Sequence, residues 1–169
     1  MRPSLSVVIV AWNSREELDR TIPALLPELR DGDELIVVDN DSGDGTADAV
    51  ASLAPAAKVV QTGRNAGFAA ACNEGARQAR GDLLVVLNPD AAPRPGFGAA
   101  IRRPWLEGRG WVAWQALVAE GDGATINSAG NPVHFTGIVW AGGHGEPIDR
   151  KSTRLNSSHR MPSRMPSSA

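Results

Sequence analysis

Two acidic segments of this sequence could bind a nucleotide or a metal ion. Asp39 ends the apolar run "LIVVD", and an acid at the carboxyl end of a buried strand can accept hydrogen bonds from ribose or from a base N–H. Asn88-Pro89-Asp90 ends a second run, "DLLVVL", and a single carboxylate there can hold a divalent cation together with substrate phosphates. Taken alone, each acid is better explained as a turn residue, because Asp and Pro are common in turns.

A third segment, "GRNAG", could approach an anion. Gly67 would let the backbone come close to a ligand, and the helix predicted after it offers free N–H groups. Arg64 would add a positive charge, although a surface Arg is most often simply solvated.

Strands and helices alternate around these segments. Apolar runs predict strands, and helical spacing predicts helices between them. A capping box of Ser14 and Glu17 would open the first helix, and a left-handed Gly81 would end the third. This alternation predicts a parallel sheet that binds ligands outside the carboxyl ends of its strands. The segments "AWNS", "DNDS", "GRNAG" and "NPD" should therefore share one rim. The predicted strands cover residues 5–10, 35–39, 57–62 and 82–87.

Bulk properties exclude several classes of protein. The chain has 169 residues, which suits one domain, and its net charge of −2 offers no basic surface to nucleic acid. Its single cysteine, Cys72, excludes an internal disulfide and fits a reducing compartment. No apolar run approaches the roughly 20 residues that span a bilayer, and the first run lacks a signal-peptide cleavage site. We expect a cytoplasmic protein that binds no nucleic acid.

Motifs of competing α/β enzymes are missing from the sequence. It contains no G-x-G-x-x-G after the first strand and no G-x-x-x-x-G-K-[ST], which argues against a dinucleotide-binding Rossmann domain and a P-loop enzyme. It also contains no G-x-S-x-G nucleophile elbow.

The composition changes at residue 149. Residues 149–169 are rich in Ser and Arg and lack apolar periodicity, so we expect them to be disordered. "DRKSTRLNSSH" and "SRMPSSA" resemble two parts of a sequencing adapter translated in frame, which would make this tail non-native. The alternative is a genuine Ser/Arg-rich tail.

The order of the motifs carries a resemblance that no single motif carries. "VVIVAWNS", "LIVVDNDSGDGT", "GRNAGFAAACNEGAR" and "GDLLVVLNPD" together resemble the nucleotide-sugar-binding half of family 2 glycosyltransferases, closest to the rhamnosyltransferase-like branch. The resemblance covers about residues 4–95 strongly, and "INSAGNPVHFTGIVWAGGHGEP" resembles the next segment less specifically. It implies a GT-A fold, a Rossmann-like three-layer α/β/α arrangement with a mainly parallel sheet, that fills residues 1–148 and is truncated at its C-terminus.

The resemblance also implies a nucleotide-sugar site. Asp39 would contact the base or ribose, and Arg64 would lie near the base and diphosphate. Asp90 would hold the metal, Mg²⁺ or Mn²⁺. Asn88 stands where the family's D-x-D element has its first acid, which leaves one carboxylate fewer and metal dependence open. The implied site comprises Ala11, Trp12, Asn13, Asp39, Arg64, Gly67, Asn88 and Asp90.

The reaction implied is inverting transfer from a nucleoside-diphosphate sugar, such as dTDP-rhamnose or a UDP-sugar, to a glycan or lipid-linked acceptor in cell-surface polysaccharide synthesis. The missing part could attach the protein peripherally to the inner face of the membrane. The family's general base lies in an acidic motif of the second half, and none follows residue 95, so no catalytic residue is assigned. We expect the chain to bind donor weakly and not to turn over.

Two other functions stay open at this point. A non-catalytic binding or signalling module of flavodoxin-like architecture is disfavoured as a phospho-receiver, because Ala11-Trp12-Asn13 stands where such domains place acids. A sugar nucleotidyltransferase would need a Gly-rich basic loop after the first strand, and "AWNSREE" is not one.

Overall fold

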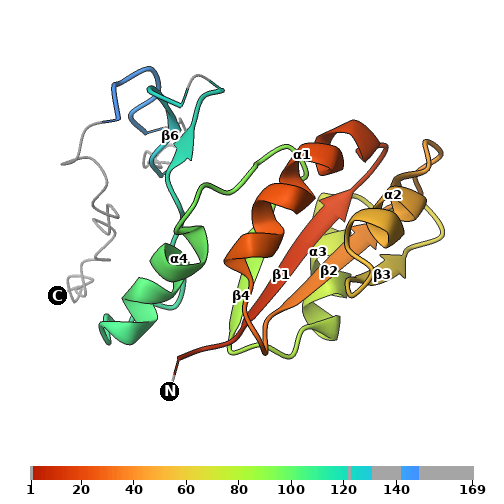
Figure 1. Cartoon of the computed structure of the whole chain (residues 1–169), viewed down its shortest axis with the longest axis horizontal. Helices are drawn as coiled ribbons and strands as arrows, with labels where there is room; N and C mark the ends of the chain where they lie inside the picture. The colour runs from red at the N-terminus through yellow and green to blue at the C-terminus, as the bar shows by residue number, and fades with distance from the viewer. Residues whose placement is uncertain (1, 122, 131–141, 149–169) are drawn as a thin grey trace, which may run out of the picture. The chain divides into compact units, whose positions relative to one another are not determined.

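The computed structural model of the protein describes residues 2–121, 123–130 and 142–148 (Figure 1). The chain divides into two compact units, Met1–Gly110 and Trp111–Ala169. The predicted non-native tail and the centre of the segment "INSAGNPVHFTGIVWAGGHGEP" lie outside the described residues, so their predictions stay untested.

The first unit contains a four-stranded parallel sheet with the strand order β3-β2-β1-β4. The register aligns Ala11 of β1 with Asp39 of β2 and Ile9 with Leu87 of β4. Because all strands run in one direction, their carboxyl ends meet at the same edge, as the sequence predicted. The strands are β1 (Leu5–Ala11), β2 (Glu34–Asp39), β3 (Lys58–Gln61) and β4 (Leu83–Leu87).

Helices cover both faces of this sheet, as the GT-A expectation requires. The chain moves outward from β1 to β3 and then returns past both strands to β4. Right-handed crossovers therefore place α3 on the face opposite α1 and α2 (Figure 1). The helices of this part are α1 (Arg15–Leu25), the 3-10 turn η1 (Leu26–Glu28), α2 (Thr46–Leu53) and α3 (Phe68–Gln78).

Helix α3 packs closely against the sheet at Gly75. A Cβ atom at this glycine would stand 2.4 Å from Cγ1 of Val8 and 3.0 Å from Cγ2 of Val38. The missing side chain lets α3 lie directly on β1 and β2. The cluster beneath it consists of Val8, Val10, Ile36, Val38 and Ala71.

The edge strand β4 is less well covered than β1. Leu84 and Val86, which are aligned with Ser6 and Val8 on the α3 side, are 49% and 46% exposed. Every residue of β1 is buried, because β1 has a strand on each side and helices over both faces.

α4 (Phe97–Leu106) is attached to the amino end of the sheet by a buried ion pair. Arg102 donates through Nε to the carbonyl of Pro3 and through Nη1 to the carbonyl of Gly98. Its Nη2 reaches the carboxylate of Asp33, and both side chains are at most 3% exposed. The carboxylate of Glu28 accepts from the N–H groups of Gly96 and Gly98, which caps the helix from outside.

The second unit contains the antiparallel pair β5 (Val118–Ala119) and β6 (Ile126–Ser128), together with a bridge between Thr125 and Pro147. Over the described parts of both units, the helices are too short or too polar to cross a lipid bilayer.

Two local predictions were wrong. Ser14 does precede α1, but its hydroxyl bonds to Trp12 instead of capping the helix, so no capping box forms. α3 ends at Gln78 and not at a left-handed Gly81. Gly81 is needed for a different reason, since a Cβ there would stand 2.6 Å from the backbone N of Ser6.

Candidate functional site

A pocket of about 450 Å³ opens at the carboxyl edge of the sheet. It lies where the strand order changes direction between β1 and β4, the place at which open α/β sheets bind ligands. The pocket is lined by Val10, Trp12, Asn13, Ser14, Glu17, Asn40, Asn65, Phe68, Asn88, Pro89 and Asp90. Four of the eight residues predicted from the sequence are among these: Trp12, Asn13, Asn88 and Asp90.

The turn after β4 presents Asn88 and Asp90 to the pocket, and both side chains are exposed. The N–H of Ala91 donates to the carbonyl of Asn88 at 3.2 Å, which closes the turn. The turn interpretation and the ligand interpretation of Asp90 are therefore compatible, because closing the turn leaves its carboxylate available.

The loop after β1 is held against the loop after β2. The N–H of Asn13 donates to the hydroxyl of Ser42, and the Asn13 side-chain oxygen accepts from the N–H of Gly43 at 2.8 Å. Asn13 adopts a positive φ of 50°, which Asn tolerates better than most residues. Trp12 is left 55% exposed on the pocket wall.

Asp44 organises this pair of loops. Hydrogen bonds from the Thr46 hydroxyl, then from the N–H groups of Arg15 and Thr46, outweigh the effect of burial and lower the pKa of Asp44. The carboxylate therefore stays charged and keeps the start of α1 beside the start of α2.

Asp39 is only 4% exposed and does not line the pocket. Its carboxylate accepts from the N–H of Ser42 at 3.0 Å, which is the turn role that the residue alone suggested. Whether it also contacts a base or ribose stays a prediction.

The neighbour of Asp39, Asn40, does line the pocket and is 3% exposed. Its amide nitrogen donates to the Asn65 side chain, and its amide oxygen accepts from the N–H of Ala66 and the hydroxyl of Thr62. Asn40 thus ties the end of β2 to the loop that precedes α3.

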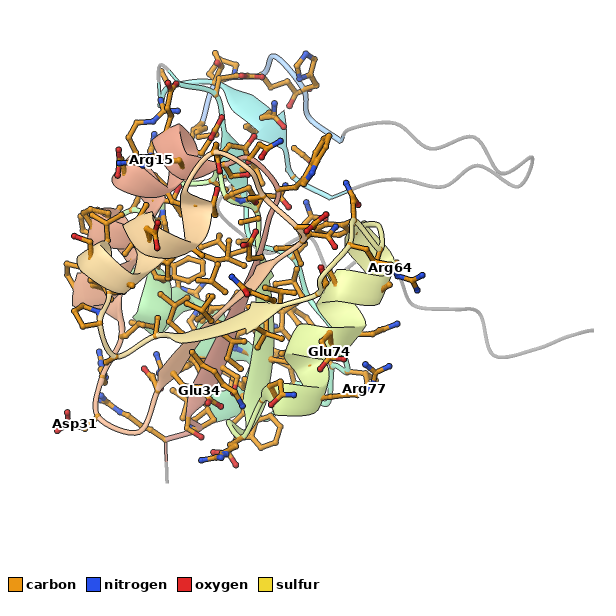
Figure 2. The ribbon with its side chains drawn as sticks, turned by 90° about the vertical axis from the view of Figure 1, so that its right-hand side faces the viewer. Arg15, Asp31, Glu34, Arg64, Glu74 and Arg77 are labelled. Carbon is orange, nitrogen blue, oxygen red and sulfur yellow. The ribbon has the colours of Figure 1, made fainter. Side chains whose placement is uncertain are left out.

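The loop before α3 uses its own polar groups more than the sequence suggested. The N–H of Gly67 donates to the Asn65 side chain at 3.0 Å, so this group is already engaged. Arg64 is exposed, points outward from the loop, and is not part of the pocket lining (Figure 2). Ala11 is buried in β1 and also lies behind the lining.

The charge of the lining is negative. Among the described residues that form the pocket, Glu17 and Asp90 carry carboxylates, and neither Lys nor Arg occurs. These carboxylates repel a diphosphate, so its binding here is favoured by a compensating positive charge. Asp90, Glu17 and the Asn88 amide offer oxygen atoms, the ligands that Mg²⁺ and Mn²⁺ prefer. The pocket therefore suits a hard divalent cation, although no three His, Cys, Asp or Glu among the described residues are grouped so that they could hold a metal ion by themselves.

Sequence reasoning did not assign seven of the eleven lining residues to the site: Val10, Ser14, Glu17, Asn40, Asn65, Phe68 and Pro89. Asn40 and Asn65 stand inside the quoted segments "DNDS" and "GRNAG", so their position at the strand ends was the available signal. Glu17 was assigned to a helix cap, and Phe68 gave no signal beyond its place at a helix start. Phe68 is 55% exposed, like Trp12, so two aromatic rings face the solvent of the pocket.

Comparison with known proteins gives a consistent family match. The family model Glycosyl transferase family 2 matches residues 6–162. This match reaches into the predicted non-native tail, and the boundary at residue 149 stays a prediction.

Two curated relatives match part of the chain. The succinoglycan biosynthesis protein ExoO of Rhizobium meliloti is 34% identical over 94 residues, which cover 55% of this chain and 27% of that protein. The dolichol-phosphate mannosyltransferase of Pyrococcus furiosus is 28% identical over 136 residues, which cover 69% of this chain and 38% of that protein. The chain thus spans well under half the length of these relatives.

Solved structures resemble the fold. The mannosyltransferase PcManGT of Pyrobaculum calidifontis, in complex with GDP-Man and Mn²⁺, has a TM-score of 0.56 at 28% identity and covers 62% of this chain and 33% of that chain. Glucosyl-3-phosphoglycerate synthase of Mycobacterium tuberculosis, in complex with Mn²⁺, UDP and glucosyl-3-phosphoglycerate, has a TM-score of 0.53 at 29% identity and covers 62% of this chain and 40% of that chain.

Proposed function

The chain belongs to glycosyl transferase family 2, and from this premise we propose that its pocket binds a nucleoside-diphosphate sugar for inverting transfer to a glycan or lipid-linked acceptor. The observation that carries the proposal is the convergence of Trp12, Asn40 and Asp90 on one pocket at the strand-order reversal. Family membership favours this function over the flavodoxin-like module.

The residues of the pocket divide into two ends. Asn40, Asn65 and Phe68 lie on the β2 side, where amide groups and an aromatic ring suit a base and ribose. Asn88 and Asp90 lie on the β4 side. Asp90 would hold a divalent cation there, and the cation supplies charge neutralisation to the departing diphosphate.

The acceptor side of the reaction is not assigned to a residue. The proposed reaction is a direct displacement in which an acceptor hydroxyl attacks the anomeric carbon and the nucleoside diphosphate leaves. A general base must take the hydroxyl proton. The resemblance implies that this base lies in an acidic motif after residue 95, and the sequence contains no such motif there, so we infer that this chain alone does not turn over. Measured sugar transfer by the 169-residue protein would contradict this inference.

The finer identity of the donor is part of the proposal. The motif order favours a rhamnosyltransferase-like enzyme with dTDP-rhamnose or a UDP-sugar as donor, whereas the solved neighbours were captured with GDP-Man or UDP. The similarity to a succinoglycan biosynthesis protein supports a role in cell-surface polysaccharide synthesis. We place the protein in the cytoplasm, with peripheral membrane association through parts outside this chain.

Calorimetric titration tests the proposal. UDP, GDP and dTDP are titrated into the protein with Mn²⁺, with Mg²⁺ and with a chelator. We expect metal-dependent binding of at least one nucleotide, weakened at least about tenfold by Asp90→Ala, since removing even a partner of a metal ligand costs about 10–100-fold in metal affinity. Asp39→Ala should also weaken binding, because it opens the loop beside Asn40.

A matched control is available on the same strand. Asp82 is exposed at the amino end of β4, where it bonds to Ser4, so Asp82→Ala should leave nucleotide binding unchanged. Binding that survives Asp90→Ala, or that Asp82→Ala weakens equally, would refute the assignment of the site.

A further inference from the structure

Thr21 is a buried hydroxyl on α1 that reaches the turn carrying Asp90. Its side chain is 1% exposed, and Oγ1 donates to the carbonyl oxygen of Pro89 at 2.6 Å. The two residues are 68 positions apart in the sequence, so the bond joins elements that only the fold brings together. Glu17, one helical turn earlier on the same side of α1, lines the pocket itself.

The accepting carbonyl belongs to the peptide group that enters Asp90. A peptide group is planar, so a bond that fixes the Pro89 oxygen also fixes the direction of the Asp90 N–H and Cα. The proline ring fixes φ on the other side of this group, near −65°. Thr21 and the ring together restrict the backbone on the N-terminal side of Asp90. This fixes the position of the Asp90 Cα atom, from which the carboxylate extends.

The hydroxyl is not used in the way that helical threonines usually use theirs. Such side chains commonly bond to a carbonyl three or four residues earlier in their own helix. Thr21 bonds instead to the turn between β4 and α4. A bond of this kind could simply fasten α1 to the end of β4, or it could orient the acid that the turn presents.

We propose that Thr21 is a positioning residue of the donor site, whose hydroxyl orients Asp90 toward a divalent cation. The proposal rests on the proposed function, because Asp90 needs a defined direction only if it holds a ligand. Partners that orient a metal-binding side chain typically change metal affinity by about 10–100-fold when they are removed.

The test compares Thr21→Val, which keeps the shape and loses the hydroxyl, with Thr21→Ser, which keeps the hydroxyl. Mn²⁺ binding is measured by electron paramagnetic resonance in the presence of whichever of UDP, GDP or dTDP binds most tightly. We expect Thr21→Val to weaken Mn²⁺ binding about tenfold and Thr21→Ser to stay within about twofold of the unchanged protein. Thr21→Ala replaces valine if the valine variant lowers the Tm of the protein.

A second measurement separates positioning from fastening. Nucleotide affinity in Mn²⁺ is measured for Thr21→Val, Asp90→Asn and the double variant. If Thr21 acts through Asp90, the valine substitution has an effect in the unchanged protein and none in the Asp90→Asn background. An equal loss in both backgrounds, or Mn²⁺ binding by Thr21→Val equal to that of the unchanged protein, overturns the role of Thr21 alone. Failure of the unchanged protein to bind any of the three nucleotides overturns the donor site and this role with it.

Discussion

Replacing Arg102 by leucine should lower the free energy of unfolding of the first unit more than a surface substitution does. Arg102 makes bonds to the carbonyls of Pro3 and Gly98 and an ion pair with Asp33, and both charged side chains are at most 3% exposed. Leucine removes all of these bonds and leaves the Asp33 carboxylate without a countercharge. Breaking a buried pair on one side costs about 3–5 kcal/mol, a large part of the 5–15 kcal/mol that stabilises a domain.

The assay is urea unfolding followed by circular dichroism. The matched control is Arg103→Leu at the next position, where Arg103 is 55% exposed and meets Glu107 only at 3.9 Å. This control should lose less than about 1 kcal/mol. A loss below about 1 kcal/mol for Arg102→Leu would refute the reasoning. Asp33→Asn added to Arg102→Leu should recover part of the loss, because it removes the unpaired charge.

The loss of stability in Arg102→Leu should depend on pH in a definite direction. Burial alone would raise the pKa of Asp33, but hydrogen bonds from Arg102 and from the N–H groups of Leu5 and Arg30 outweigh it and lower that pKa. The ionised carboxylate therefore stabilises the protein above the unfolded pKa near 4, and this contribution is lost as the pH falls through the folded pKa. Without Arg102 the pKa of Asp33 rises. The difference in free energy of unfolding between the unchanged protein and Arg102→Leu should therefore become smaller from pH 6 toward pH 3.

Two further substitutions test the pocket and the core. Glu17→Gln should tighten metal-free nucleoside-diphosphate binding about fivefold, since the repulsion between two unit charges at close range in water is worth about 1 kcal/mol. Calorimetry with a chelator measures this affinity. An unchanged affinity would mean that the diphosphate does not approach Glu17. Gly75→Ala should lower the free energy of unfolding by about 1–3 kcal/mol, because its Cβ would stand 2.4 Å from Val8. The control is Gly121→Ala, since a Cβ at Gly121 would have no atom within 4 Å. Equal Tm values for the two variants would contradict the close contact at Gly75.

The order of strands and helices could be predicted from sequence because each apolar run ends in a polar segment. Those polar segments also predicted that Trp12, Asn13, Asn88 and Asp90 would share a rim, and the structure brings them to one pocket. Side-chain burial could not be predicted so well. The runs of β1 and β4 look alike, yet β4 leaves Leu84 and Val86 half-exposed, since it is an edge strand in the described sheet.

The contribution of α1 to the pocket could not be predicted, because it depends on distant packing. Glu17 has the spacing of a capping box, and only the tertiary structure shows that it faces the pocket. Thr21 looks like an ordinary helical residue, and its bond to Pro89 spans 68 positions. Arg64 is the reverse case: its charge suggested a ligand contact, but in the structure its side chain points outward (Figure 2).

The central position of β1 determines the order in which the sheet can be completed. β1 is synthesised before the other three strands of this sheet, but one of its two neighbours is β4, and Ser4 meets Asp82 at a separation of 78 residues. Until β4 has left the ribosome, one edge of this strand, which is apolar except for Ser6, has no partner. Such late, long-range pairing slows folding and exposes the chain to aggregation in the meantime. The strand that anchors the pocket is thus the last to be enclosed.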